Sequence, residues 1–401
     1  MSSEAHDARR LVCARALRGL GDGALVVLLP AYWLAEGGGS AAISELTTAT
    51  LLGSALATLA AGLVAHRVAP RNVLFAACAL LVATGVGFAF APSHGWLLAI
   101  AFAGTFNPTA GDVSVFLPTE QALLAGSGAP ERRAARFSVY NVAGAAGGML
   151  GSYCAGQLGA FGVGLADGTR AALLGYAALG IVLAALYLGL RAGRARAGTA
   201  SPERAPLRQS RGLVARLAAL FALDSFGGGF AIQTLLVAWL IERHHASLEQ
   251  VSFAMAVSMA LSAASQLVAP WIALRIGLIR TMVFTHLPAQ IFLVLAAFMP
   301  NLGLAITFLV LRSLLSAMDV PARNSYVMAV VSPSERAAAA SITNVPRSLA
   351  SVLPPIAAGW MLDHSTFGWP LVIAGTTKAT YDLILLSMFR NVRPPEEQPV
   401  S

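Results

Sequence analysis

Charged side chains inside long apolar stretches are the residues of this 401-residue chain that could do chemistry. A charge at the centre of a bilayer costs about 2.5–3.5 kcal/mol on insertion scales, so it normally faces a cavity or a partner. A carboxylate removed from water can release and rebind a proton near neutral pH, whereas an arginine keeps its charge and can hold an anion. The chemistry on offer is therefore the binding of protons, ions and solutes. The residues concerned are Asp22, Asp112, Glu120, Asp224, Arg312, Asp319, Arg323, Lys378 and Asp382.

Asp22 and Asp112 are the predicted proton-coupling residues. Asp22 lies in the first part of an apolar run, between Gly21 and Gly23, and Asp112 lies near the middle of another run. Carboxylates placed in this way can carry a proton during a transport cycle. For both residues the alternative is a structural role, in which the carboxylate satisfies a neighbouring helix.

Arg312 is the candidate anchor for an anionic solute, because its guanidinium cannot lose its proton. The alternative is a structural ion pair with Asp112 or Asp319. The other side chains predicted to line a solute cavity are Tyr32, Phe106, Asn107, Gln233 and Asp319. For the aromatic residues near span ends, the belt at the membrane interface is a competing explanation.

Lys378 and Asp382 are spaced i, i+4, which places them on the same face of a helix. We predict that they neutralise each other as a structural ion pair.

The composition shows which elements must position these residues. Of the chain, 57% is hydrophobic and only 11% is charged, against about 25% charged in ordinary soluble domains. This balance excludes a soluble enzyme, a disordered protein and a nucleic-acid binder. A membrane-spanning helix needs about 20 mainly apolar residues, and strand-like alternation is absent. The sequence therefore predicts an all-α membrane protein with twelve spans, near 15–35, 43–65, 72–92, 96–125, 137–160, 171–190, 214–241, 251–274, 281–300, 303–330, 340–362 and 368–389.

The basic residues predict the orientation of these spans. Of the 27 basic residues, 22 lie in one set of connections and two in the opposite set. Since basic loops stay on the cytoplasmic side, both termini and the long central loop are expected in the cytoplasm. The predicted domains are a six-helix bundle at 1–190, a linker at 191–213 and a second bundle at 214–401.

The two halves of the sequence repeat each other. Gly19–Glu36 matches Ser225–Glu242, and Pro118–Ala143 matches Pro321–Pro346, both without gaps and in the same direction. Parallel halves with a site between them are typical of alternating-access carriers. In the second match Glu120 falls on Arg323. We predict that these two residues pair across the pseudo-two-fold axis when the cytoplasmic side closes; the alternative is that each points into its own half.

Glycines predict where helices approach each other closely. Gly144, Gly147, Gly148 and Gly151 recur along one span, and Gly53 lies on another. A helix face without side chains allows the backbone of a neighbouring helix to come near.

The segment GLVAHRVAPR, from Gly62 to Arg71, resembles the loop signature of the major facilitator superfamily. Gly62, Arg67 and Arg71 match the family pattern, while His66 replaces its usual aspartate. A fainter copy occupies Pro270–Arg280. The resemblance covers essentially the whole chain and implies two pseudo-symmetric six-helix bundles that work by alternating access. It also implies that Gly62, His66, Arg67 and Arg71 help to latch the cytoplasmic side, where the repeat independently predicts a gate of Glu120 and Arg323.

The expected function is therefore secondary active transport of a small organic solute. Proton-coupled export is the leading prediction, and uptake or exchange of an organic anion at Arg312 is the alternative. A non-transporting sensor on the same fold is a remote third possibility. We predict no catalytic residue, no metal and no cofactor, because the chain has neither a phosphate-binding Walker loop nor a metal-ligand cluster. The expected partners are the solute, protons and the lipid bilayer, without nucleic acid, for a monomer in the bacterial inner membrane.

Overall fold

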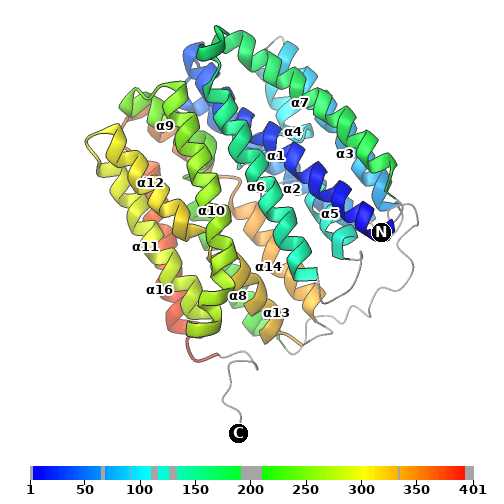
Figure 1. Cartoon of the computed structure of the whole chain (residues 1–401). Coiled ribbons are helices and arrows are strands. Elements are labelled where there is room, and N and C mark those ends of the chain that lie inside the picture. Colours follow the sequence, from blue (N-terminus) through cyan, green and yellow to red (C-terminus); the bar gives the residue numbers. More distant parts are fainter. Residues whose placement is uncertain are drawn as a thin grey trace. The chain divides into compact units, whose positions relative to one another are not determined.

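The computed structural model describes residues 3–64, 68–91, 93–109, 116–125, 133–190, 210–332 and 335–392. Regular structure in this part of the chain is helical (Figure 1). The predicted all-helical fold is confirmed. The helices that lie wholly within the described N-terminal residues are α1 (Ser3–Ala35), α2 (Ser40–Val64), α3 (Pro70–Phe90), α4 (His94–Ala103), α5 (Phe116–Ala125), α6 (Arg133–Gly156) and α7 (Leu165–Leu188). The later helices are α8 (Arg211–Gly229), α9 (Gln233–His244), α10 (Leu248–Ile276), α11 (Leu278–Phe298), α12 (Leu302–Ser316), α13 (Asp319–Val330), α14 (Arg336–Ala350), α15 (Pro354–His364) and α16 (Trp369–Phe389).

Length and hydropathy support a multi-pass membrane protein. Eight helical segments among the described residues are long and apolar enough to cross a membrane, at 40–60, 70–90, 165–188, 211–244, 248–276, 278–298, 302–330 and 369–389. Each lies on a predicted span. The other four predicted spans lie on α1, on α4 with α5, on α6 and on α14 with α15.

The chain divides into two compact units. Unit 1 comprises 1–200 and 232–260, and unit 2 comprises 201–231 and 261–401. The grouping departs from the predicted bundles in one segment, 232–260, which belongs to unit 1 because α9 packs against α1 and α2. The Thr47 and Thr234 hydroxyls are 3.2 Å apart, and the Ser40 hydroxyl donates to Glu242 at 3.0 Å.

Several predicted spans are broken where the sequence favours it. The run 214–241 is interrupted at Phe230–Ile232, directly after three glycines that weaken a helix, and the run 340–362 is interrupted before Pro354. The run 303–330 breaks at Ala317–Met318, so Asp319 opens α13. Broken helices at membrane depth are typical of transporter binding sites, because unwound backbone needs polar surroundings.

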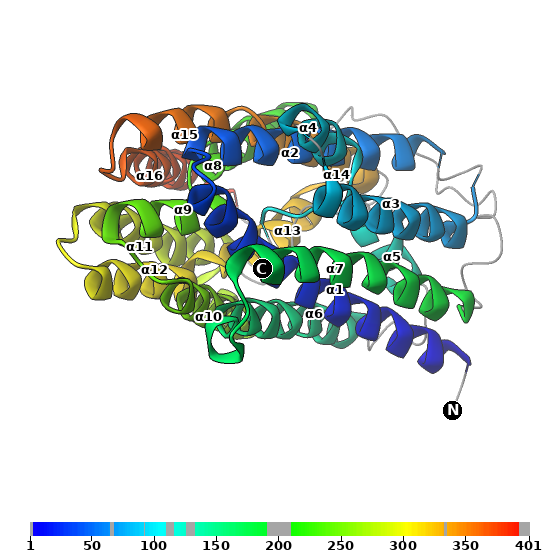
Figure 2. The same ribbon diagram turned by 90° about the horizontal axis from the view of Figure 1, so that it is seen from above.

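Glycines bring α1 and α6 together within unit 1, as Figures 1 and 2 both show. A Cβ atom on Gly23 would overlap the backbone of Gly148, and a Cβ atom on Gly147 would overlap the carbonyl of Ala16. The predicted close approach of this glycine-rich span is confirmed. Gly53 has the same role, since a Cβ atom there would overlap the backbone of α4.

Candidate functional site

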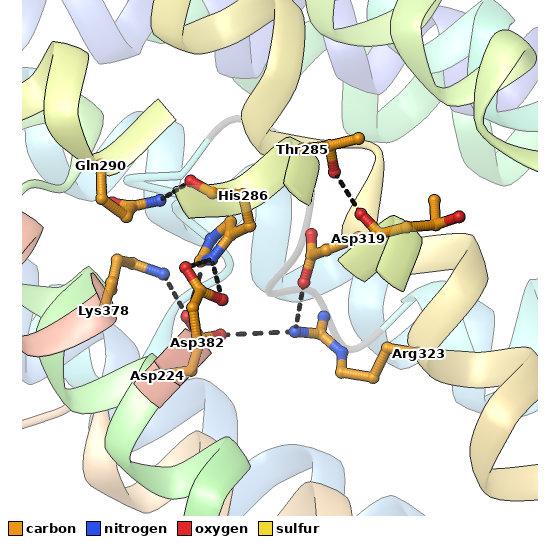
Figure 3. Close-up of polar contacts among 9 residues, drawn as sticks. Asp224, Thr285, His286, Gln290, Asp319, Arg323, Lys378 and Asp382 are labelled. Atoms are coloured by element: carbon orange, nitrogen blue, oxygen red, sulfur yellow. Dashed lines mark hydrogen bonds and ion pairs between the residues drawn. The ribbon is translucent and has the colours of Figure 1, made fainter. Parts of the chain in front are cut away.

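Asp224 on α8 is the centre of a buried network of charged side chains in unit 2 (Figure 3). It is 3% exposed and receives two cations from other helices. The Lys378 ammonium on α16 lies 2.5 Å from Oδ1, and the Arg323 guanidinium on α13 donates to Oδ2 at 3.3 Å. We call this set the Asp224 network, with the members Asp224, His286, Asp319, Arg323, Lys378 and Asp382.

Arg323 joins two carboxylates in this network. Its Nη1 also lies 2.9 Å from Asp319, one turn earlier on α13, and its guanidinium lies 5.6 Å from the centre of the Phe221 ring. Asp319 therefore orients the arginine that reaches Asp224. The prediction that Asp319 lines a solute cavity stays untested, but its observed partner is Arg323.

His286 on α11 lies between two other members of the network. Its Nδ1 is 3.0 Å from both carboxylate oxygens of Asp382, and its Nε2 is 3.8 Å from Oδ1 of Asp224. The Gln290 side chain donates to the His286 carbonyl at 3.3 Å, and the Tyr381 ring stands edge-on at 6.1 Å. These contacts hold the imidazole between the carboxylates of α8 and α16.

The predicted mutual ion pair of Lys378 and Asp382 is wrong in its partners. The spacing is helical as expected, but Lys378 extends to Asp224 and Asp382 extends to His286. Sequence spacing places both residues on one face of α16, whereas the opposing helices decide which charge each of them meets.

Glu120 on α5 is held by three donors inside unit 1. It accepts hydrogen bonds from Arg18 on α1, and from the hydroxyls of Tyr140 on α6 and Tyr187 on α7, each at 2.5 Å. Glu120 is fully buried. In this structure Glu120 pairs with Arg18 and Arg323 pairs with Asp224, each within its own half, and the predicted pairing of Glu120 with Arg323 on closure of the cytoplasmic side stays a prediction.

The two intra-half pairs are related by the sequence repeat. Continuing the first gapless match by one residue places Arg18 on Asp224, and the second match places Glu120 on Arg323. The Arg18–Glu120 pair and the Asp224–Arg323 pair thus occupy equivalent positions with opposite polarity. We call these the inverted pairs.

Asp22 on α1 lies in a second polar group of unit 1 and is 5% exposed. The Tyr176 hydroxyl is 3.1 Å from its Oδ1 and also 3.1 Å from the Thr105 carbonyl, and Asn107 donates to its Oδ2 at 3.5 Å. No ion pair of Asp22 occurs within the described residues. Two predicted site residues, Asp22 and Asn107, are therefore brought together.

The remaining predicted site residues have different surroundings. Phe106 is buried in the core of unit 1, 6.2 Å from the Phe88 ring, and its predicted place in a solute cavity stays a prediction. Tyr32 borders a pocket of about 330 Å³ with Glu36 and Arg170. At the start of α9, the side-chain oxygen Oε1 of Gln233 is buried and has no hydrogen-bond partner among the residues the structure describes.

Arg312 on α12 has no hydrogen bond and no ion pair in the described part of the chain, and its Nε is buried. The predicted alternative of an ion pair with Asp319 is not observed. Asp112, His66 and Arg67 lie outside the described residues. Gly62 is part of α2, and Arg71, in the first turn of α3, lies 5.4 Å from the Phe75 ring.

Five members of these groups were missed by sequence reasoning: Arg18, Tyr140, Tyr176, Tyr187 and His286. His286 lies within the predicted span 281–300, where any ionisable residue is a site candidate, so that rule alone would have found it. The tyrosines carry no such signal, because a buried tyrosine is also an ordinary core residue.

Known proteins share this sequence pattern and fold. The profile of the Major Facilitator Superfamily matches residues 11–245 and 217–401. An uncharacterized membrane protein of Saccharomyces cerevisiae is 24% identical in an alignment of 363 residues that covers 80% of each chain.

Solved transporter structures resemble this one over almost their whole length. A bacterial homologue of the human lysosomal transporter Spinster has a TM-score of 0.75 at 16% identity and covers 100% of both chains. The nucleoside transporter NupG has a TM-score of 0.75 at 14% identity, over 96% of this chain and 100% of its own. The xylose transporter XylE from E. coli gives 0.75 at 14% identity, over 97% of each chain. At these identities the likeness concerns the fold alone.

Proposed function

Because this chain belongs to the Major Facilitator Superfamily and is a secondary transporter of small solutes rather than an enzyme, we propose that it moves its solute in exchange for protons, as an exporter. This proposal depends mainly on the environment of Asp22. This carboxylate is buried on α1 and its hydrogen-bond partners, Tyr176 and Asn107, are neutral. Removal from water without a paired cation favours the protonated form of a carboxylate, and the ability to take up a proton is the requirement for coupling.

Transport by purified protein in liposomes tests this proposal. A thermal-shift screen against metabolites and drugs, with a nucleoside and D-xylose included because similar folds carry them, first supplies a compound that stabilises the protein. The radiolabelled compound is then measured in liposomes with an imposed pH gradient. We expect its accumulation to follow the gradient and to collapse when a protonophore is added. Flux that ignores the gradient would overturn proton coupling.

A second candidate function is uptake or exchange of an organic anion at Arg312. It is favoured by one observation: this guanidinium makes no ion pair among the described residues, and its Nε is buried without a hydrogen-bond partner. An arginine of this kind binds carboxylates and phosphates in a two-point geometry. If the candidate is right, carboxylates stabilise the wild type and Arg216→Gln, an exposed control, but not Arg312→Gln. Equal stabilisation of all three proteins would exclude it.

The orientation with both termini in the cytoplasm, the monomeric state and the bacterial inner membrane are further parts of this proposal. The orientation is supported by the distribution of basic residues, most of which lie in or near connections predicted to face the cytoplasm. A fluorescent protein fused to the C-terminus should fluoresce in cells, because its fluorophore forms in the cytoplasm.

A further inference from the structure

The imidazole of His286 lies between two carboxylates from different helices. Its Nδ1 is 3.0 Å from both oxygens of Asp382 on α16, and its Nε2 is 3.8 Å from Oδ1 of Asp224 on α8 (Figure 3). A ring that carries its single proton on Nδ1 donates to Asp382 and turns a bare Nε2 toward Asp224. A second proton on Nε2 then meets a carboxylate that is already in place.

That carboxylate oxygen is already occupied by Lys378. The ammonium of Lys378 lies 2.5 Å from Oδ1 of Asp224, the same oxygen that Nε2 of His286 faces. Two cations cannot share one oxygen without repelling each other, so the doubly protonated imidazole and Lys378 compete for Asp224.

From this geometry we propose that His286 is a proton-binding site and that its protonation displaces Lys378 from Asp224. The ring gains one proton on Nε2 from solution, and no covalent bond other than this N–H is made or broken. The role of the switch in transport rests on the proposed proton coupling, but the competition itself is a property of the side chains.

Charges from every helix packed around the imidazole bear on its protonation. Carboxylates favour the second proton and cations oppose it, but none of these side chains has an ordinary titration range as near neutral pH as histidine. Asp224 on α8 and Tyr381 and Asp382 on α16 contact His286 directly. Arg312 on α12, Arg323 on α13, Arg347 on α14 and Lys378 on α16 act through Asp224, and Asp319 acts through Arg323.

Lys378 is the most solvent-exposed member of the Asp224 network. It passes over the glycines of α8, where a Cβ atom on Gly228 would lie 3.3 Å from its Cε and 3.6 Å from its Nζ. Its side chain is 11% exposed, whereas the carboxylate of Asp224 is 5% exposed and that of Asp382 is fully buried. The ammonium is therefore the member of the network with the readiest access to solvent.

Lysine is also the chemically suitable cation for this position. Lys378 is the single lysine of the chain, in which the other 26 basic residues are arginines. An ammonium is a compact charge on a flexible stem, whereas a guanidinium would hold the carboxylate at two points and resist displacement.

The single lysine gives a direct test, because ¹⁵N-lysine labelling of the full chain in lipid nanodiscs yields one side-chain ammonium signal from Lys378. We expect this signal to move between two positions as the pH falls from mildly alkaline to mildly acidic. In His286→Gln the signal should stay at its alkaline position over the same range. His364→Gln removes an exposed histidine and is the matched control, which should behave like the wild type.

A second measurement needs no substitution in the network and so does not depend on the folding of a variant. In wild-type protein labelled at histidine as well, one imidazole should titrate with the same midpoint as the Lys378 signal. An unchanged titration of Lys378 in folded His286→Gln, or clearly different midpoints in the wild type, would overturn the proposal. Failure of proton-driven flux would instead overturn the proposed function. The competition between His286 and Lys378 could still be measured from their two signals.

Discussion

Single residues in this protein are best distinguished by the donors that surround their carboxylates. Asp22 is bound by the neutral side chains of Tyr176 and Asn107, whereas Glu120 is bound by Arg18 and two tyrosine hydroxyls. A carboxylate that lacks a paired cation is suited to gain and lose a proton, and one that holds an arginine is suited to stay charged. We therefore expect these two buried acids of unit 1 to have different roles.

Asp22→Asn is expected to uncouple transport from protons. An amide has nearly the shape of the carboxylate but cannot take up a proton, so accumulation driven by a pH gradient should fall at least about tenfold, which corresponds to about 1.4 kcal/mol of lost coupling. Exchange of solute without a gradient should continue. Glu45→Gln, at an exposed glutamate that pairs with His94, is the control. Wild-type accumulation in Asp22→Asn would show that the proton is carried elsewhere.

Glu120→Gln is expected to destabilise the protein instead. The substitution removes the carboxylate partner of a buried guanidinium, and breaking a buried ion pair costs about 3–5 kcal/mol. Unfolding of the purified protein in detergent should therefore begin at a clearly lower temperature. Glu249→Gln, at an exposed glutamate, should leave the melting temperature unchanged. Equal melting temperatures of the two variants would mean that the contacts of Glu120 with Arg18, Tyr140 and Tyr187 add little stability.

Which residues matter was easier to predict from the sequence than which residues meet. Asp22, Glu120, Asp319 and Lys378 stand out because a charge in an apolar run is costly and needs a reason. Their partners could not be read from spacing, since the direction of a side chain depends on helices that pack against it from far along the chain. Lys378 has Asp382 one turn away on its own helix and still pairs with Asp224.

Helices in this fold are positioned by glycine as much as by apolar side chains. The contact of α1 with α6 depends on backbone-to-backbone approach at Gly23, Gly147 and Gly148. The sequence predicted this from the glycine spacing alone, because only a face without side chains permits such proximity. The break between α8 and α9 was not predicted, since an apolar run continues through it.

Gly147→Ala is expected to separate α1 from α6. The added methyl group would overlap the carbonyl of Ala16, and excess volume in a packed interface costs about 1–3 kcal/mol. The yield of folded protein and its melting temperature should both fall. Gly175→Ala on α7 is the matched control, because nothing lies within 4 Å of a Cβ atom there. If the two alanine variants melt together, the tight packing of α1 on α6 is not what stabilises this unit.

The whole molecule is built from two halves with similar sequences, and the inverted pairs give one buried ion pair the opposite polarity in each half. In the first half a cation on α1 meets an anion on α5, and in the second half an anion on α8 meets a cation on α13. The repeat was visible in the sequence, and so was the opposite sign of Glu120 and Arg323. Opposite signs at equivalent positions do not by themselves indicate a contact between halves, because each of these residues has a partner of opposite charge in its own half.

Charge reversal separates these two arrangements. Glu120→Arg should prevent stable folding, because it places two buried cations together. Adding Arg18→Glu restores the pair with its polarity exchanged, so folded yield should recover in large part. Adding Arg323→Glu to Glu120→Arg should restore nothing and should also break the contact with Asp224. Recovery in that second double variant alone would favour pairing between halves.

The inverted pairs also bear on biogenesis, when similar helices enter the membrane one after another. In a duplicated sequence, a helix of one copy can pair incorrectly with a helix of the other copy. If α1 met α13 in place of α5, Arg18 would face Arg323; if α8 met α5 in place of α13, Asp224 would face Glu120. Like charges buried against each other are strongly unfavourable, so each incorrect helix pairing is disfavoured. The opposite polarity of the two pairs thus favours the packing of each helix within its own half.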